Sequence, residues 1–226
     1  MGGRTLGLVP VAGRRRTAHE DVTESLRNAI LGGALPGGTR LVQADIAAEL
    51  GVSNTPVREA MRQLATEGLI QFDPFRGAVV RTPTLEEVQE VYELRLVLEP
   101  LIIRKSVERM TSSALQSAWA LQRAMEDVSD VAEWVQLNRK LHNSLADAAR
   151  SPRAAVIVRS LQDAAAPQVA LSIKADMRRM TDGNAEHAAL LEAIEKRDAD
   201  RAAAVTSAHL QATVLAIEME AQAARN

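Results

Sequence analysis

Apolar residues recur at helical spacing through most of the chain. Val57, Met61 and Leu64, for example, share one face of a helix. Two short apolar runs, at 69–72 and 78–81, are separated by the turn-forming residues of the intervening segment and predict a two-stranded hairpin. Beyond this hairpin the helical spacing continues almost to the end without strand signals. The pattern predicts a mainly α protein.

The first third has the order helix, turn, helix, hairpin. We predict a helix at 20–31, a turn over 35–41 and a helix at 42–50. Gly51 can adopt the left-handed backbone of a sharp helix end, Ser53 is placed to cap the next helix, and its first turn tolerates Pro56. This order is that of a winged helix-turn-helix, followed by a C-terminal all-α helical bundle.

The bundle should begin at Thr84, because Thr84 and Glu87 have the spacing of a capping box. Pro100 and Pro167 are expected to kink their helices and to widen the bundle interior. Arg95 lies beside an apolar stripe and could pair with a bundle acid or bind an anionic ligand. The predicted helices lie near 84–109, 112–128, 131–149, 152–174, 183–197 and 199–222. The stripe consists of Val88, Val91, Leu94, Leu98 and Leu101.

We therefore expect three parts: a flexible basic arm at 1–16, a DNA-binding domain at 17–83 and an effector-binding, dimerising bundle at 84–226. The arm contains Arg14, Arg15 and Arg16 and could follow DNA phosphates or be a loose terminus. Residues 1–83 hold ten arginines against eight acids, whereas the remainder holds seventeen basic and twenty-one acidic residues. The positive balance thus lies with the predicted DNA-binding part.

Composition narrows the class of protein. The chain has no cysteine, which excludes disulfides and thiolate metal sites and favours the cytoplasm. No apolar run approaches the roughly 18 residues of a membrane span, and no signal sequence is evident. We expect a soluble cytoplasmic protein without a membrane partner.

The segment that follows Gly51 resembles the DNA-binding domain of GntR-type transcription regulators. The resemblance rests on Ser-Asn-Thr-Pro-Val-Arg-Glu-Ala at 53–60, Glu-Gly-Leu-Ile at 67–70 and Arg-Gly at 76–77, and it covers 19–82. It implies that double-stranded DNA is contacted by Ser53, Asn54, Thr55 and Arg58 of the reader helix and by Arg76 and Gly77 of the wing. Arg62 lies one turn beyond Arg58, and Arg40 could reach a phosphate.

Two positions of this domain depart from the family pattern. Arginine is frequent where this chain has Asn54, and a polar or charged residue is common in place of Ala44. Asparagine can pair with adenine through two hydrogen bonds, whereas arginine favours guanine. A shifted base preference at the operator follows as a hypothesis.

Three of the four histidines lie in the predicted bundle, at His142, His187 and His209. Asn138 precedes His142 by one helical turn and shares its face. His187 and His209 lie at matching distances on either side of a predicted turn near 198, where Asp198 can cap the last helix. Each histidine could simply be hydrogen-bonded in a core or at the surface. Together, the three imidazoles and the amide oxygen could bind a divalent metal.

The bundle also resembles the C-terminal ligand-binding domain, called FCD, of the FadR-type branch of GntR regulators, over about 84–222. This resemblance implies that Asn138, His142, His187 and His209 bind a metal ion, of which zinc and nickel are preferred here. Asn138 replaces a frequent carboxylate and should weaken or change metal binding. The resemblance also implies a small carboxylate effector, with Arg95 as its candidate anchor. Because the chain has only five aromatic residues (two Trp, one Tyr and two Phe), an aliphatic acid is favoured.

The sequence thus predicts a homodimeric, ligand-responsive repressor that binds a palindromic operator, since two-fold symmetry in the protein matches that of such a site. Effector binding would rearrange helices around 84–109 and 183–222 and change the spacing of the two reader helices. An architectural DNA binder would leave the histidines unused. A three-histidine hydrolase would leave the reader helix unused, and its nearest acid, Glu186, lies about 100° around the helix from His187. We therefore expect no enzyme.

Overall fold

The computed structural model describes Leu8 and residues 17–223. The chain forms two compact units that divide between Thr82 and Pro83. The predicted arm at 1–16 lies outside the described residues apart from Leu8. The side chain of Leu8 is buried, and the backbone N–H of Leu8 donates to Oε1 of Glu49 at 2.8 Å.

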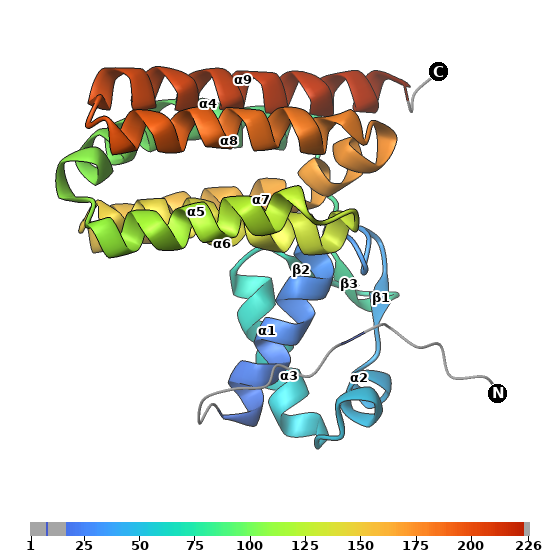
Figure 1. The fold of residues 1–226 in the computed structure, drawn as a ribbon. Coiled ribbons are helices and arrows are strands. Elements are labelled where there is room, and N and C mark those ends of the chain that lie inside the picture. The colour runs from blue at the N-terminus through green and yellow to red at the C-terminus, as the bar shows by residue number, and fades with distance from the viewer. Residues whose placement is uncertain (1–7, 9–16, 224–226) are drawn as a thin grey trace. The chain divides into compact units, whose positions relative to one another are not determined.

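The described part of the first unit contains three helices and three short strands (Figure 1). Thr17 and Glu20 form a capping box at the start of the first helix. Gly51 ends the second helix at φ 66°, the left-handed backbone predicted for it. The elements are α1 (Ala18–Leu31), β1 (Arg40–Leu41), α2 (Gln43–Leu50), α3 (Asn54–Thr66), β2 (Ile70–Asp73) and β3 (Gly77–Val80).

The sheet has one strand more than predicted. Its order is β1-β3-β2, and β1 pairs antiparallel with β3 through Arg40 opposite Val79 and Leu41 opposite Ala78. The prediction of a simple turn over 35–41 was wrong at its last two residues. Two residues are too few to display an alternating pattern, and their strand conformation depends on β3, which lies far along the chain.

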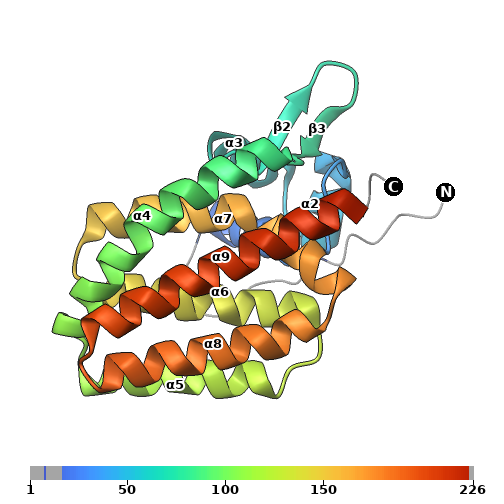
Figure 2. The same ribbon diagram turned by 90° about the horizontal axis from the view of Figure 1, so that it is seen from above.

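The second unit is a bundle of six described helices. α4 packs along α9 and α7, α5 packs along α6 and α8, and α8 packs along α9 (Figure 2). The predicted capping box of Thr84 and Glu87 is present at α4, and Asp198 accepts from the backbone N–H of Arg201 in α9. The helices are α4 (Leu85–Arg109), α5 (Ser112–Glu126), α6 (Val131–Ala148), α7 (Pro152–Ala175), α8 (Arg178–Glu195) and α9 (Ala199–Ala223).

α8 starts at Arg178, five residues before its predicted start at Gly183. Glycine weakens a helix and therefore looked like its boundary, but here the helix continues through it. A Cβ added at Gly183 would lie 3.2 Å from the indole of Trp134, so the glycine leaves room for this ring of α6 against α8. The extra turn brings Arg179 into the bundle interior.

α4 differs from its predicted apolar stripe. Val88 is buried as expected, but Leu94 and Leu101 are about half exposed. Arg95 and Glu99 are buried instead, and Nε of Arg95 donates to Oε1 of Glu99 at 2.6 Å. Two opposite charges one turn apart can both be buried because each is the ion-pair partner of the other. The alternative reading of Arg95, a salt bridge with a bundle acid, is thus present.

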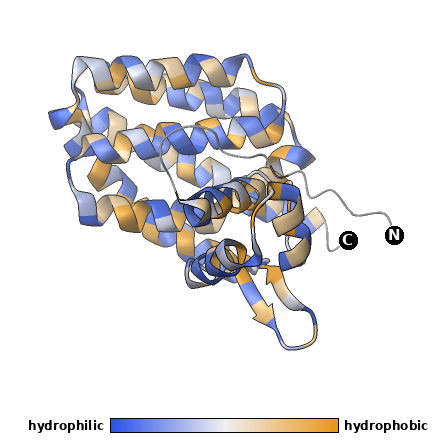
Figure 3. Cartoon of the chain, turned by 90° about the horizontal axis from the view of Figure 1, so that it is seen from below, coloured by the Kyte–Doolittle hydropathy of each residue, from blue (hydrophilic) through white to orange (hydrophobic). Residues whose placement is uncertain are grey.

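Hydrophobic and hydrophilic residues are interspersed along each helix (Figure 3). Within 17–223, no helix has the length and apolar character needed to cross a membrane. The bundle core includes Trp134, Leu141, Leu145, Leu191 and Ile194. These residues come from α6 and α8, the helices that carry His142 and His187.

Candidate functional sites

The reader helix α3 separates its packing face from its polar face. Val57, Met61 and Leu64 are almost fully buried against the rest of the first unit. The residues predicted to contact DNA are all exposed: Ser53, Asn54, Thr55, Arg58 and Arg62. Ser53 occupies the N-cap position as predicted, but its side chain makes no capping hydrogen bond. The helix therefore presents polar groups at its N-terminus, an end that attracts anions, and two exposed guanidinium groups farther along.

The wing turn is held by Asp73, whose Oδ1 accepts from the backbone N–H groups of Phe75 and Arg76 at 2.7 Å each. Arg76 is exposed, and Gly77 adopts φ 77°, so the turn favours glycine at that position. Arg40 is also exposed, on β1 of the same sheet. The wing thus places one arginine at its turn and another on its outer strand.

The three bundle histidines meet in the interior. His142 comes from α6, His187 from α8 and His209 from α9. Their ring centroids are 5.1 Å apart for His142 and His187, 5.4 Å for His142 and His209, and 4.9 Å for His187 and His209. One ring nitrogen of each can be chosen so that all three lie within 4.8 Å of one another. Side chains distant in sequence therefore form a single cluster of nitrogen ligands.

The cluster contains polar atoms that lack partners. His187 is 1% exposed, and neither of its ring nitrogens has a hydrogen bond with a described residue. Oδ1 of Asn138 is likewise buried without a partner. Burial lowers the pKa of His142 to about 3 and also lowers the pKa of His187, so both rings are neutral at pH 7. Neutral imidazoles and an unpaired amide oxygen are suited to hold a divalent metal, which would satisfy these atoms.

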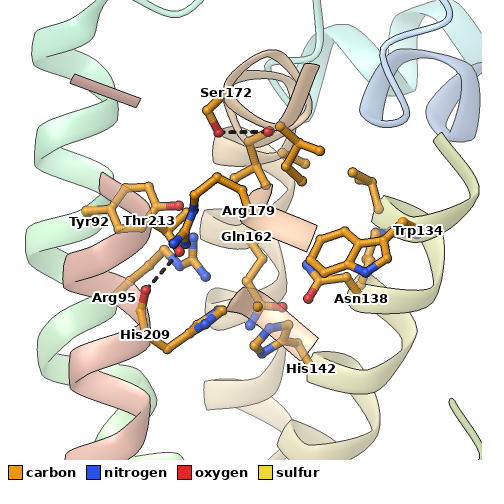
Figure 4. Close-up of a pocket in the computed structure, with 16 residues that line it drawn as sticks. Tyr92, Arg95, Trp134, Asn138, His142, Gln162, Ser172, Arg179, His209 and Thr213 are labelled. Atoms are coloured by element: carbon orange, nitrogen blue, oxygen red, sulfur yellow. Dashed lines mark hydrogen bonds between the residues drawn. The ribbon is translucent and has the colours of Figure 1, made fainter. Parts of the chain in front are cut away.

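A pocket of about 50 Å³ adjoins the cluster. In Figure 4, His142 and His209 lie at one end of this pocket, and Tyr92, Thr213 and Arg179 lie farther along it. Arg95 lines it as well, although its Nε is engaged by Glu99. Nε2 of Gln162 donates to the other carboxylate oxygen of Glu99 at 3.2 Å. Five helices contribute to the lining, namely α4, α6, α7, α8 and α9.

Comparison with known families agrees with both units. The sequence model of the bacterial regulatory proteins of the gntR family matches residues 18–80, and that of the FCD domain matches residues 90–212. The chain belongs to the GntR family. It is a transcription regulator rather than an enzyme, with a winged helix-turn-helix and a helical C-terminal domain.

The similarity to individual relatives covers most of this GntR-family chain. An uncharacterised HTH-type transcriptional regulator, YdhC of Bacillus subtilis, is 26% identical over 81% of this chain and 84% of its own. A gluconate operon transcriptional repressor of Bacillus licheniformis is 27% identical over 77% and 74%. The solved structure of Escherichia coli McbR/YncC has a TM-score of 0.81 and 22% identity, and it covers 90% of this chain and 98% of that one. That structure shares the fold.

The sequence did not predict the positions of two residues of this GntR-family site: Glu186, which contacts a pocket histidine, and Arg179, which lines the pocket. Glu186 was weighed only as a hydrolytic acid beside His187, but its Oε2 lies 2.6 Å from Nδ1 of His209 on the neighbouring helix. Because a carboxylate only accepts, this contact keeps the proton on Nδ1 and leaves Nε2 free as a ligand. Arg179 was overlooked because α8 was predicted to start after it.

Proposed function

We propose that this protein is a ligand-responsive transcription repressor that senses a small carboxylate through a metal-containing pocket in its helical domain. The observation that carries the proposal is the buried cluster of His142, His187 and His209, in which His187 has no hydrogen-bond partner among the described residues. Burying a polar ring without a partner is costly, so the cluster is suited to a ligand that completes it. Zinc and nickel are among the metals that imidazole ligands suit.

The residues around the cluster supply the rest of the site. Asn138 offers a fourth ligand atom from the same face of α6 as His142. A divalent ion bound there would provide a Lewis-acidic centre for a carboxylate oxygen. Arg95, Gln162 and Thr213 line the adjoining pocket and orient an acid by charge and hydrogen bonding. The pocket is small, which favours short aliphatic acids.

Residues 17–83 are proposed as the DNA-binding domain and 84–226 as the effector-binding and dimerisation domain. Double-stranded DNA would be read by the exposed face of α3, with the wing arginine and Arg40 on phosphates. The direction of the response, repression, is proposed from the relatives that are named as repressors.

A homodimer on a palindromic operator is proposed because one reader helix covers too few base pairs for a genomic site. An exposed apolar strip on α4, formed by Leu94, Val97 and Leu101, supports it, since such strips commonly mark interfaces. Sedimentation should give a dimer that Val97→Glu converts to a monomer with weaker operator binding. Val156→Glu, at an exposed valine on α7, should leave the dimer intact. A monomeric wild type would overturn this part.

The regulatory proposal is tested by operator selection from random duplexes, followed by binding measurements with metal-free protein, zinc-loaded or nickel-loaded protein, and loaded protein with succinate or butyrate. We expect sequence-specific binding, metal bound in the purified protein and release of DNA by an acid. Specific binding that no metal or acid alters would support an architectural protein instead. Purified protein without metal, and no rise in melting temperature on adding zinc or nickel, would exclude the metal site.

A further inference from the structure

We propose that Arg179 and the hydroxyl of Tyr92 form a second anion subsite in the pocket, so that the effector is a short dicarboxylate rather than a monocarboxylic acid. One acid group would lie at the histidine end and the other at Arg179. The inference rests on the proposed function, because it assumes that this pocket binds a carboxylate. Beyond that function, it states that the effector has two acidic groups and that Arg179 selects for the second.

The charged side chains that line the pocket are all positive. Three arginines line it, and none of its described lining residues is acidic. Two of these arginines are engaged closely by carboxylates: Arg95 donates to Glu99 at 2.6 Å, and Arg139 donates to Asp163 through two hydrogen bonds of 2.6 and 3.1 Å. Their charges are therefore largely balanced by neighbouring residues.

Arg179 is engaged much more weakly. Its side chain is 17% exposed, and its nearest acidic partner, the mostly exposed Asp182, lies 3.7 Å away. That separation exceeds hydrogen-bonding distance, so the guanidinium donors of Arg179 stay available. A guanidinium shielded from water favours a carboxylate that can accept two parallel hydrogen bonds.

Tyr92 provides an independent observation at the same end of the pocket. Its side chain is 1% exposed, and its hydroxyl has no well-directed hydrogen bond with a described residue. The guanidinium of Arg95 lies 4.6 Å from the ring centroid, and because a guanidinium can only donate to the hydroxyl oxygen, the hydroxyl proton stays available to an acceptor. Burial raises the pKa of Tyr92, against the opposing charges of Arg95 and Arg179, so the hydroxyl keeps its proton as a donor.

These features favour an acid with two charged ends. A monocarboxylate at the histidines would leave Arg179 and the Tyr92 hydroxyl without acceptors inside the pocket, which is unfavourable for buried donors. The pocket is lined by side chains of five helices of the bundle, which favours a short chain. Malonate and succinate place two carboxylates a few bonds apart and match this description.

Calorimetric titration of zinc-loaded full-length protein with succinate and butyrate tests the inference, since the two acids have the same number of carbons and differ by one carboxylate. We expect succinate to bind about 10 to 100 times more tightly, the range for adding charge-assisted hydrogen bonds. Arg179→Gln should remove this preference and leave butyrate affinity nearly unchanged. Tyr92→Phe should reduce the preference while keeping the ring.

Arg178→Gln is the matched control. Arg178 adjoins Arg179 in sequence, but it is exposed and paired with Asp176 at 2.7 Å, so its removal should leave both affinities unchanged. If Arg179→Gln fails to fold, Arg179→Lys and Tyr92→Phe provide the same test through a smaller loss of preference. Equal wild-type affinities for the two acids, or a preference that survives in Arg179→Gln, would overturn the second subsite but retain a carboxylate sensor. Binding of neither acid would overturn both proposals.

Discussion

The reader helix and the histidine pocket place their polar residues in opposite environments. In α3, the polar residues from Ser53 to Arg62 are exposed, and the apolar residues between them form the packing face. In the bundle, His142, His187 and Arg95 lie inside the core that stabilises the domain. Stability and the proposed binding therefore use different faces in the first unit and the same interior in the second. Substitutions should uncouple the two properties in α3 and couple them in the bundle.

The largest expected effect is on the buried ion pair. Arg95→Met leaves the carboxylate of Glu99 buried without its cation, which should lower the free energy of unfolding by about 3–5 kcal/mol. Both tryptophans of the chain, Trp119 and Trp134, lie in the bundle, so fluorescence-detected urea unfolding reports this unit. The control is Arg104→Met, because Arg104 and its partner Asp200 are exposed and such pairs contribute about 1 kcal/mol or less. Equal losses in the two variants would refute a special role for the buried pair.

The next effect concerns metal binding. His187→Ala removes one of the three proposed nitrogen ligands and should abolish the gain in melting temperature on adding zinc or nickel. In the wild type, a metal at 100 times its dissociation constant should stabilise the protein by about 2.7 kcal/mol. His19→Ala alters the histidine outside the bundle and should keep the full gain. A wild-type gain that His187→Ala retains would place the metal elsewhere.

A smaller change should follow at the group that orients His209. Glu186→Gln keeps the size of the side chain but removes the charge beside Nδ1, and should weaken metal binding about 10- to 100-fold. Competition with a chromogenic chelator measures this affinity, and Glu186→Asp should restore part of it. Glu192→Gln, at an exposed site on the same helix, is the control. A purely structural Glu186 would instead lower the stability of metal-free protein without changing metal affinity.

The contrast between the reader helix and the pocket also explains which features could be predicted from the sequence. The reader helix was predictable because its cap, its arginines and its apolar face lie within about fifteen consecutive residues, as do Thr84 and Glu87 at the start of α4. The convergence of His187 and His209 was also accessible, because the turn at Asp198 joins two antiparallel helices at a known spacing.

Contacts between distant helices were not accessible in this way. The burial of Glu99 beside Arg95 depends on which face α4 turns inward, and the apolar stripe indicated a different face. The entry of Arg179 into the pocket depends on the packing of Gly183 against Trp134, which no local pattern records. Glu186 likewise acts on the neighbouring helix instead of on its own.

The smallest expected effect is on DNA binding by α3. Arg58→Ala removes an exposed cation from α3 and should weaken binding to the selected operator on the order of tenfold, since one base or phosphate contact is lost. If that contact is to a phosphate, the slope of log affinity against log salt should fall by about one. The urea transition followed by far-ultraviolet circular dichroism, which includes the helices of the first unit, should not move. Thr66→Ala, at the exposed far end of the same helix, should change neither property. An Arg58→Ala protein that loses stability along with DNA affinity would show that α3 does not separate binding from packing.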